Sequence, residues 1–407
     1  MKILYIHQFF KTPEDPGGTR SYWIARELID QGHQVTMLTS NKPLTQKKEI
    51  EYIDGIEVIY LNVIYDSGKM SIYERYKAFI QFVVRSTPEA LNIKNVDLVI
   101  ATSTPLTVGI PALVLKKFKN IPYVFEVRDL WPEVPIQMGG LKNPILKKTA
   151  LWLEKVIYRN SLHIIALSPG MKEGILNRNV DPLKISTIPN MSKIDKFWRR
   201  PKDLKLQQHM GLRNDSFKAI YFGAMNIAND IPYIIEAGKK LIELKKDRIE
   251  IFFLGDGASK EEMQKKCKDE NIHNIKFFDK VPMEELSEIV NLADVSLVTF
   301  SNIPILATNS PNKLFDSLSA GKAIIVNSPG WTRTLVKENN CGVYVDPMDS
   351  SDLAKTLIYL SENPDLCNTM GENARNLAEK KYDKSLLCRQ FAEIVDKKNQ
   401  AKVKEML

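Results

Sequence analysis

Short apolar runs, separated by amphipathic stretches of helical length, recur along the chain. The first run, Lys2–His7, is continuously apolar in the way of a strand buried on both faces of a parallel sheet. A loop with Gly17 and Gly18 follows, then a helix to about Gln31, then a second apolar run at Val35–Ser40. This order of strand, glycine loop, helix and strand predicts the first part of a doubly wound α/β sheet.

The pattern runs through the chain twice, with an interruption between the two passes. In the first half, further strands are predicted at Asp97–Thr102, Ile121–Glu126 and His163–Leu167. The segment Ser186–Phe197, with its proline and asparagine, breaks the pattern, and charged, turn-rich sequence continues to about Ser216. Strands are then predicted at Lys218–Phe222, Ile249–Leu254, Ile275–Phe278, Val295–Thr299, Ala323–Val326 and Gly342–Val345.

Two doubly wound, Rossmann-like α/β domains account for this double pattern. We predict an N-terminal domain at 1–195, a C-terminal domain at 196–385 and a charged helical tail at 386–407. Two such domains are expected to face each other across a cleft, which is a favoured place for a ligand.

Composition places the chain among soluble globular proteins. It has 407 residues, 44% of them hydrophobic and 26% charged, enough for two full cores. No apolar stretch approaches the roughly 18 residues that a transmembrane helix needs, and the N-terminus reads as a strand without a cleavage site. The four cysteines (Cys267, Cys341, Cys367, Cys388) have no metal-ligand spacing, so we expect a reduced, cytoplasmic protein.

The formal charge of +8 allows nucleic acid, an anionic membrane or a phosphorylated substrate as a partner. Because no nucleic-acid-binding motif accompanies the dispersed lysines, we favour a membrane surface and nucleotide-sugar phosphates. The aromatic and basic segment Tyr65–Arg85 can form a helix that lies on a bilayer surface, although such a helix more often buries its apolar side in the core.

The stretch Asn309–Asn327, NSPNKLFDSLSAGKAIIVN, predicts a loop, a short helix, a glycine stop and a buried strand. Pro311 and Asn312 would open the helix, with Lys313 beside its unpaired N–H groups, an arrangement that suits a diphosphate. Asp316 falls one turn later, where its carboxylate can accept hydrogen bonds from ribose hydroxyls. The alternative is an ordinary helix N-terminus with a solvated lysine and aspartate.

The loop after Ile121–Glu126 carries an unusual density of charge. Glu126, Arg128, Asp129 and Glu133 lie within a few residues at the carboxyl end of a predicted parallel strand, where open α/β sheets place their ligands. The alternative is a local network of salt bridges with Trp131 packed on it. Gly17 and Gly18 likewise allow a close backbone approach by a ligand, or only a tight turn.

Taken in order, the segments GGTRSYWIARELIDQGHQVTMLTS, EVRDLWPE, ALSPGM, IPNMSKIDKF, YFGAMNIAND, FLGDG and SPNKLFDSLSAGKAIIV resemble the GT-B glycosyltransferases of the retaining family 4. The resemblance covers nearly the whole chain. It is nearest to bacterial enzymes of O-antigen, capsule or exopolysaccharide assembly, including N-acetyl-L-fucosamine transferases. Two departures stand out: Thr308 and Asp316 occupy the positions of the two signature glutamates, and the segment GAMNIAND lacks the usual arginine.

The resemblance implies a retaining transferase that moves a hexose, N-acetylated or deoxy, from a UDP-sugar. The acceptor would be a saccharide linked to undecaprenyl diphosphate, which suits a cytoplasmic enzyme on the inner membrane face. Donor-binding roles are implied for Gly17, Gly18, Gly223, Gly255, Val281, Pro311, Asn312, Lys313 and Asp316. The absence of a convincing DxD loop agrees with metal-independent catalysis, in which Lys313 and helix N-termini stabilise the leaving diphosphate.

For the reaction itself, the resemblance implies that Asp129 lies nearest the acceptor hydroxyl, with Arg128 beside it. Arg20 and Glu126 are expected to contact the acceptor. The leaving phosphate would take the proton, so that catalysis consists mostly of positioning and charge stabilisation.

The sequence also bears on three other functions. A UDP-sugar epimerase or hydrolase of the same fold is expected to show clusters of histidine and acidic residues, which the five histidines do not form. A non-catalytic two-lobed binding protein needs an export signal and does not explain the Pro311–Lys313 turn. An NAD-dependent dehydrogenase is disfavoured because the three-glycine spacing is missing.

Overall fold

The computed structural model describes residues 1–15, 17–40, 42, 44–65 and 70–406. The chain divides into two compact units, and each is described by itself. The first comprises Met1–Pro189, Thr308–Ser310 and Ser385–Leu407, and the second comprises Asn190–Ala307 and Pro311–Lys384.

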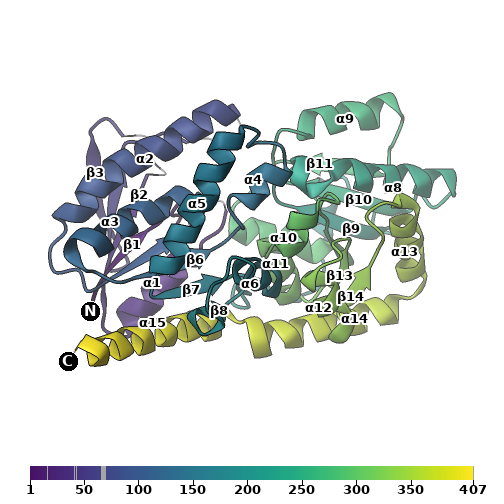
Figure 1. Ribbon diagram of the computed structural model, residues 1–407. Helices are drawn as coiled ribbons and strands as arrows, with labels where there is room; N and C mark the ends of the chain where they lie inside the picture. The colour runs from purple at the N-terminus through teal and green to yellow at the C-terminus, as the bar shows by residue number, and fades with distance from the viewer. Residues whose placement is uncertain (16, 41, 43, 66–69, 407) are drawn as a thin grey trace. The chain divides into compact units, whose positions relative to one another are not determined.

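The first unit is a doubly wound sheet in which strands and helices alternate. Its strands are β1 (Lys2–Ile6), β2 (Gln34–Thr39), β3 (Lys48–Ile53), β4 (Ile56–Leu61), β5 (Leu98–Thr102), β6 (Tyr123–Val127), β7 (His163–Ala166) and β8 (Ile185–Thr187). Its α-helices are α1 (Arg20–Asp30), α2 (Ile72–Asn92), α3 (Gly109–Lys119), α4 (Glu133–Gln137), α5 (Pro144–Asn160), α6 (Pro169–Leu176) and α15 (Lys384–Met406), the last beginning one residue before the unit boundary. Figure 1 shows α2, α3 and α5 on one side of these strands and α1 and α15 on the other.

The described strands of the first sheet follow the order β3-β4-β2-β1-β5-β6-β7-β8. All neighbouring pairs are parallel except β3 and β4, which form the hairpin at Asp54 and Gly55, both with positive φ. Because the chain moves from β1 outward to β2 and later returns to β5 on the other side of β1, the point where the strand order reverses lies between β1 and β5. Ligands of open α/β sheets bind at the carboxyl ends of the strands at such a point.

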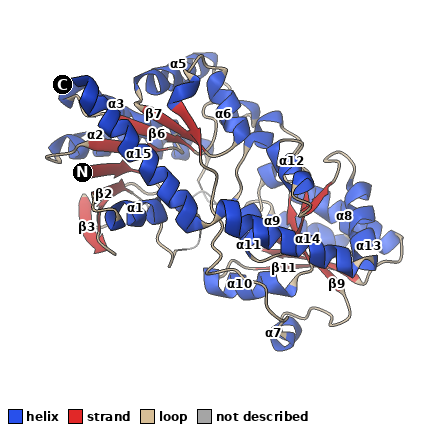
Figure 2. Cartoon of the chain, turned by 90° about the horizontal axis from the view of Figure 1, so that it is seen from below, coloured by secondary structure: helices blue, strands red, loops and turns tan. Residues whose placement is uncertain are grey.

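The second unit repeats the architecture with a fully parallel sheet. Its strands are β9 (Phe217–Phe222), β10 (Ile249–Leu254), β11 (Ile275–Phe278), β12 (Val295–Val298), β13 (Ala323–Val326) and β14 (Gly342–Tyr344), in the order β11-β10-β9-β12-β13-β14 among the described residues. Its α-helices are α7 (Leu204–His209), α8 (Ile231–Glu243), α9 (Lys260–Asp269), α10 (Met283–Leu292), α11 (Asn312–Ser319), α12 (Trp331–Glu338), α13 (Ser350–Glu362) and α14 (Pro364–Leu377). Figure 2 shows helices on both sides of the strands in each unit.

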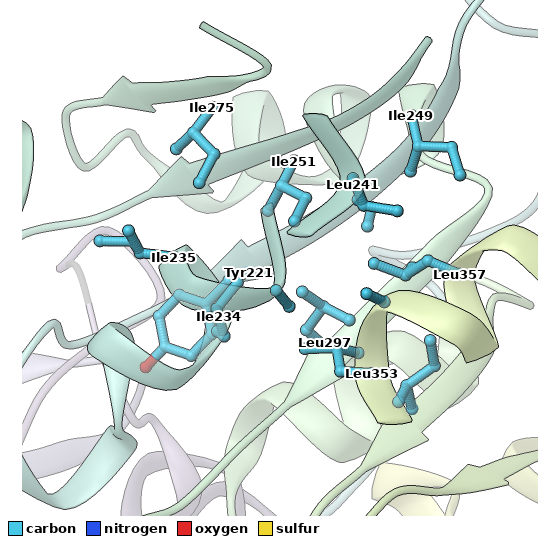
Figure 3. Close-up of a cluster of buried hydrophobic side chains, with 14 of the residues drawn as sticks. Tyr221, Ile234, Ile235, Leu241, Ile249, Ile251, Ile275, Leu297, Leu353 and Leu357 are labelled. Atoms are coloured by element: carbon cyan, nitrogen blue, oxygen red, sulfur yellow. The ribbon is translucent and has the colours of Figure 1, made fainter. Parts of the chain in front are cut away.

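The second sheet is apolar on both faces because successive residues of its strands point in opposite directions. Tyr221, Ile251 and Phe253 belong to a core that includes residues of α8, α9 and α13. Ile220 and Phe252 belong to a second core that includes residues of α10. Figure 3 shows the first core, with the Tyr221 ring among the aliphatic side chains and its hydroxyl oxygen at the edge of the cluster.

The predicted fold class, two doubly wound Rossmann-like domains, is confirmed. The first and longest stretch of the first unit ends at Pro189, whereas the sequence placed the boundary at 195/196. The predicted tail 386–407 is not a separate element: α15 belongs to the first unit, where Asp396 pairs with His33 at 3.1 Å and Lys398 donates to the carbonyl of Leu183 at 3.2 Å. The predicted cleft between the domains stays a prediction.

None of the described helices combines the length and the hydropathy that crossing a bilayer requires. The predicted interfacial helix is α2, although residues 66–69 of the segment lie outside the described residues.

Candidate active site

Two glycines bring the ends of neighbouring strands of the second unit together. The Gly223 N–H, after β9, donates to the carbonyl of Leu254 at 2.9 Å, and Gly255 follows at the end of β10. A Cβ on Gly255 would lie 2.0 Å from the carbonyl oxygen of Gly223. Both residues have positive φ, +122° and +148°, which strongly favours glycine. The two predicted donor-binding glycines therefore form one close-packed pair of strand ends.

Lys313 reaches this pair of strand ends from the second residue of α11. Its Nζ donates to the hydroxyl of Tyr221 at 2.6 Å and to Oδ1 of Asn229 at 3.1 Å, and it lies 3.8 Å from the centre of the Tyr221 ring. Its Cε is 3.6 Å from the position of a Cβ on Gly223. Lys313 is therefore an element of the strand-end site and not the solvated lysine of the alternative interpretation.

The Lys313 ammonium is buried with neutral partners. Only 9% of the residue is exposed, and burial lowers the pKa of its ammonium to about 7. No ion pair joins Lys313 to any Asp or Glu in the described part of the chain. A buried cation without a counter-ion is costly, and an anionic ligand would supply the missing charge.

The first turn of α11 adds unpaired backbone donors beside Lys313. Pro311 precedes the helix and no side chain caps its N-terminus, while Asn312 is its first residue and is half-buried. The amides of Asn312 and Lys313 have no intrahelical partner by position, and the positive end of the helix dipole lies there. Backbone amides and an ammonium group together make a site suited to a diphosphate.

Asp316 is buried and paired, which the sequence did not predict. Its Oδ1 lies 2.9 Å from Nζ of Lys193, and both side chains are 8% exposed. Burial is the main cause that raises the pKa of Asp316, and Lys193 opposes it. The predicted ribose contact stays a prediction that would have to use Oδ2 of this carboxylate. Val281, the predicted neighbour of the base, follows β11 and packs its half-buried side chain on the α10 core.

In the first unit, Arg20 and Glu126 bind each other and not solvent. Arg20 Nε donates to Glu126 Oε1 at 2.8 Å, and the two side chains are 1% and 0% exposed. The guanidinium also donates to the carbonyls of Ile188 and Pro189, and Thr102 donates to Glu126 Oε2 at 2.9 Å. Both side chains are covered, and they join α1, β6 and the residues after β8. The predicted contact of Arg20 and Glu126 with the acceptor stays a prediction.

In the charged loop after β6, some side chains are paired within the protein and one carboxylate is not. Glu133 pairs with Arg178, 45 residues further along the chain, at 3.2 Å, and Trp131 packs edge-on against Phe79, so neither forms the local network of the alternative interpretation. Asp129 differs: its half-buried carboxylate has no hydrogen bond or ion pair in the described part of the chain. Burial raises the pKa of Asp129 to about 6, with the charge of Arg128 opposing the shift. Asp129 is thus the unengaged carboxylate of the three in this loop.

Arg128 lies between strand ends of the first sheet. Its backbone N–H donates to Oγ of Ser103, after β5, at 3.0 Å. Its Nη1 lies 3.2 Å from Nε2 of His7, directly after β1. Arg128 and Asp129 therefore stand at the carboxyl ends of strands beside the reversal of strand order, where the first unit is expected to bind a ligand.

Gly17 and Gly18 lie in the same unit, separated from α1 only by its N-cap residue, Thr19. Gly17 has a φ of +129°, which requires glycine-like freedom, and no side chain caps the N-terminus of α1. This backbone leaves the first N–H groups of α1 unpaired by side chains, as a close approach by a ligand needs. The predicted donor-binding role of Gly17 and Gly18 stays a prediction.

Sequence reasoning missed the side chains that hold the predicted site residues. Tyr221 and Asn229 fix Lys313, and Lys193 pairs with Asp316. Asn229 stands in the segment GAMNIAND, where the resemblance indicates only the absence of an arginine. His7 stands at the end of the first predicted strand, and that position was the available signal for its role.

Comparison with known proteins adds to this geometry. The model of the glycosyl transferase 4-like domain matches residues 17–191, and the model of the glycosyl transferases group 1 family matches residues 203–377. The probable glycosyltransferase WbjE of Pseudomonas aeruginosa is 23% identical over 79% of this chain and 78% of its own length. The UDP-Gal:alpha-D-GlcNAc-diphosphoundecaprenol alpha-1,3-galactosyltransferase of Escherichia coli is 25% identical over 58% of this chain and 60% of its own.

Solved structures show the same fold. Sucrose-phosphate synthase from Thermosynechococcus elongatus superposes with a TM-score of 0.78 at 17% identity, covering 98% of this chain and 99% of its own. HepE from Anabaena, solved in complex with UDP-glucose, has a TM-score of 0.73 at 18% identity and covers 98% of this chain and 100% of its own. These relatives favour a transferase over the epimerase and the binding protein. With its two domain matches in series, the chain is a glycosyltransferase of the GT-B fold, in which a glycosyl transferase 4-like domain precedes a group 1 glycosyl transferase domain.

Proposed function

We propose that this glycosyltransferase moves a hexose, N-acetylated or deoxy, from a UDP-sugar to a saccharide linked to undecaprenyl diphosphate. It would serve assembly of a bacterial surface polysaccharide such as O-antigen, capsule or exopolysaccharide, with retention of the anomeric configuration. The observation that carries the proposal is Lys313, a buried ammonium held by neutral partners at the end of β9. A nucleoside diphosphate has the charge that this group lacks.

In this proposal, the leaving diphosphate binds at the strand ends of the second unit. Lys313 and the first amides of α11 would stabilise the negative charge that develops as the glycosidic bond breaks. Gly223 and Gly255 carry no side chain, which lets the two strand ends pack together beside Lys313, where we propose that the phosphates bind. Together these groups can supply the charge stabilisation without a metal ion, and we propose metal-independent transfer.

The relatives support the choice of substrates. HepE was solved with UDP-glucose, and the Escherichia coli relative is named for a UDP-galactose donor and a diphosphoundecaprenol-linked acceptor. In the first unit, Asp129 would orient the acceptor hydroxyl, and its raised pKa lets it accept a hydrogen bond or share a proton near neutral pH. Arg128 beside it offers guanidinium donors to oxygen-rich groups of the same substrate.

A lipid-linked acceptor requires the enzyme to work at a membrane surface. Tyr73, Ile80 and Val84 of α2 are 78%, 62% and 65% exposed, so this helix presents an apolar stripe outward in addition to its buried side. Helix α5, which packs on α3 as α2 does, exposes Ile145 and Trp152. Lys147, Lys148 and Lys155 on α5 and Lys77 and Arg85 on α2 accompany these side chains, a combination that suits an anionic bilayer surface.

Thermal unfolding with nucleotides tests the proposal. UDP, GDP, ADP, CMP and NAD⁺ are each added at saturating concentration, with and without EDTA. A ligand at about 100 times its Kd adds about 2.7 kcal/mol to the free energy of unfolding. We expect UDP to raise the melting temperature most, and EDTA to leave the shift unchanged. A larger shift with GDP would change the donor, and no shift with any nucleotide would contradict the proposed donor site.

Transfer itself is measured next. UDP-sugars with N-acetylated and deoxy hexoses are offered with a polyprenyl diphosphate saccharide, and the anomeric configuration of the product is read by NMR. An axial donor linkage that becomes equatorial in the product would contradict retention.

A further inference from the structure

We infer that His7 is a positioning residue for the transfer reaction, because it holds the guanidinium of Arg128 at the carboxyl ends of β1, β5 and β6. The inference rests on the proposed function, in which Arg128 and Asp129 serve the acceptor. The three residues that carry it are Ser21, His7 and Arg128, which form one chain of contacts. Nδ1 of His7 lies 2.8 Å from Oγ of Ser21, and Nε2 of His7 lies 3.2 Å from Nη1 of Arg128.

The chemistry of the partners assigns the tautomer of the ring. A guanidinium has only donors, so Nε2 of His7 must accept from Arg128 and carry no hydrogen. The ring hydrogen then resides on Nδ1 and is donated to Ser21 Oγ. A protonated imidazole would direct a hydrogen at the guanidinium, and the contact would be lost.

Burial holds the ring in this state. His7 is 2% exposed and Ser21 is fully buried. The pKa of His7 is lowered well below its ordinary value, mainly by burial and additionally by the positive charge of Arg128. The histidine is therefore a neutral acceptor throughout the neutral pH range, and a proton shuttle is not its role.

Arg128 is fixed at both of its ends by this arrangement. Its backbone N–H donates to Ser103 after β5, and one guanidinium nitrogen is held by His7 after β1. The other guanidinium donors have no hydrogen-bond partner among the described residues. A long side chain held at one nitrogen in this way keeps its remaining donors aimed in one direction, which reduces the freedom lost when a substrate binds.

Two substitutions of His7 distinguish the contact made by Nε2 with Arg128 from the contact made by Nδ1 with Ser21. The end of a glutamine side chain reaches about as far as Nε2, so His7→Gln can still accept from Arg128. Asparagine reaches only as far as Nδ1, so His7→Asn keeps the Ser21 contact and loses Arg128. We expect His7→Asn and Arg128→Ala each to lower kcat/KM for the acceptor by roughly 10- to 100-fold. His7→Gln should stay within a few-fold of the unmodified enzyme.

The double variant shows whether His7 acts through Arg128. If it does, His7→Asn combined with Arg128→Ala loses no more than Arg128→Ala alone. Multiplied losses, or full activity of His7→Asn, would overturn the inference. The thermal shift with UDP should be the same in all four proteins, since these residues belong to the first unit.

His163 is the matched control in the same unit. It is also a buried histidine paired with a serine, with Nε2 2.9 Å from Oγ of Ser186, but no arginine among the described residues bonds to it. His163→Asn should lower the melting temperature and leave kcat/KM for the acceptor unchanged. A loss of kcat/KM in this variant equal to that of His7→Asn would show that only structural damage is being measured.

Spectroscopy tests the same contact without any substrate. With ¹⁵N-labelled histidine, the His7 signal, identified by its loss in His7→Asn, should show a protonated Nδ1 and an unprotonated Nε2. Arg128→Ala should shift the Nε2 signal. A protonated Nε2 would overturn the inference even in an active enzyme. The expected tautomer in an enzyme that transfers no UDP-sugar would instead contradict the proposed function and leave the His7–Arg128 contact in place.

Discussion

At the scale of single residues, the protonation of Lys313 controls the proposed donor site. Its pKa is lowered to about 7, so below pH 7 the folded protein carries a buried charge that the unfolded chain solvates. This cost falls as the pH rises above 7, and the free energy of unfolding rises accordingly. A bound diphosphate reverses the preference by favouring the charged form.

We therefore expect UDP binding to take up a proton and to weaken as the pH rises above about 7. Lys313→Met should weaken UDP binding by about 1–3 kcal/mol, the usual range for a hydrogen bond to a charged group. Calorimetry at several pH values, in buffers of different ionisation enthalpy, measures both effects.

Lys322 provides the control. It is a buried lysine of the same unit whose pKa is also lowered to about 7 by burial, and its Nζ donates to the carbonyls of Asn291 and Ala293. Lys322→Met should change stability and leave the affinity for UDP as it was. Equal loss of UDP binding in both variants would contradict a direct contact between Lys313 and the diphosphate.

Neutralising Asp129 should raise the stability of the protein and lower its turnover. Its pKa is raised to about 6 by burial, so the folded protein binds the proton more tightly than the unfolded chain. The carboxylate thus lowers the free energy of unfolding, fully above pH 6 and not at all below about pH 4. Asp129→Asn should raise this free energy by about 1–3 kcal/mol at neutral pH and lower turnover.

Melting curves at pH 4 and pH 7.5, together with transfer rates, measure both effects of Asp129→Asn. Glu133→Gln is a suitable control, because Glu133 is paired with Arg178 and should gain no stability on neutralisation. Unchanged turnover in Asp129→Asn would remove Asp129 from the site.

The sequence could predict Lys313 and Asp129 because both follow simple positional rules. One stands in the first turn of a helix after a loop, and the other follows a buried parallel strand. The sequence could not predict that Arg20 and Glu126 form an ion pair with each other, because these residues are far apart in the chain. The same holds for Lys193 with Asp316 and for His7 with Arg128.

At the scale of elements, the glycines at the ends of β9 and β10 decide how closely two loops approach. Gly255→Ala would place a methyl group 2.0 Å from the Gly223 carbonyl oxygen, at a φ of +148°. We expect a loss of at least about 1–3 kcal/mol in the free energy of unfolding and a smaller thermal shift with UDP.

Gly211→Ala is the matched control for this prediction. Gly211 also has positive φ, +64°, but a Cβ there meets only the end of the Lys276 side chain at 3.8 Å. It should cost about 1 kcal/mol and leave the shift with UDP intact. If Gly255→Ala behaves in the same way, close packing of the two loops is not needed for nucleotide binding.

Helices and strands with a clear hydrophobic periodicity were predictable from the sequence. Those that depend on contacts between distant parts of the chain were not. The β3–β4 hairpin has Asp54-Gly55 at its turn, a pair typical of hairpins. Helix α6 begins after Ser168, a typical N-cap residue whose side chain accepts from the Met171 N–H at 2.9 Å. The short strand β8 was missed because it has three residues and lies beside the prolines of the domain boundary.

At the scale of the whole molecule, the exposed stripes of α2 and α5 predict binding to anionic vesicles. Sedimentation with vesicles of neutral lipid and of mixed anionic lipid measures it, at low and at high salt. We expect binding to rise with anionic lipid and to fall with salt, because each basic residue near the surface contributes about 1 kcal/mol.

Trp152→Ser and Ile80→Ser should weaken the binding to anionic vesicles further, since each removes a large exposed apolar side chain. Leu183, which is 80% exposed beside β8, gives a control substitution away from both helices. Equal binding to neutral and anionic vesicles would contradict the predicted docking surface.

Helix α15 comes after the second unit in the chain but packs in the first unit, and this order matters during translation. Leu387, Phe391, Ala392 and Val395 of α15 are at most 3% exposed, so the last helix completes the packing of the unit that is translated first. While the ribosome makes the second unit, the apolar surface that awaits α15 stays uncovered. Folding of the first unit is therefore completed only after the second unit has been translated.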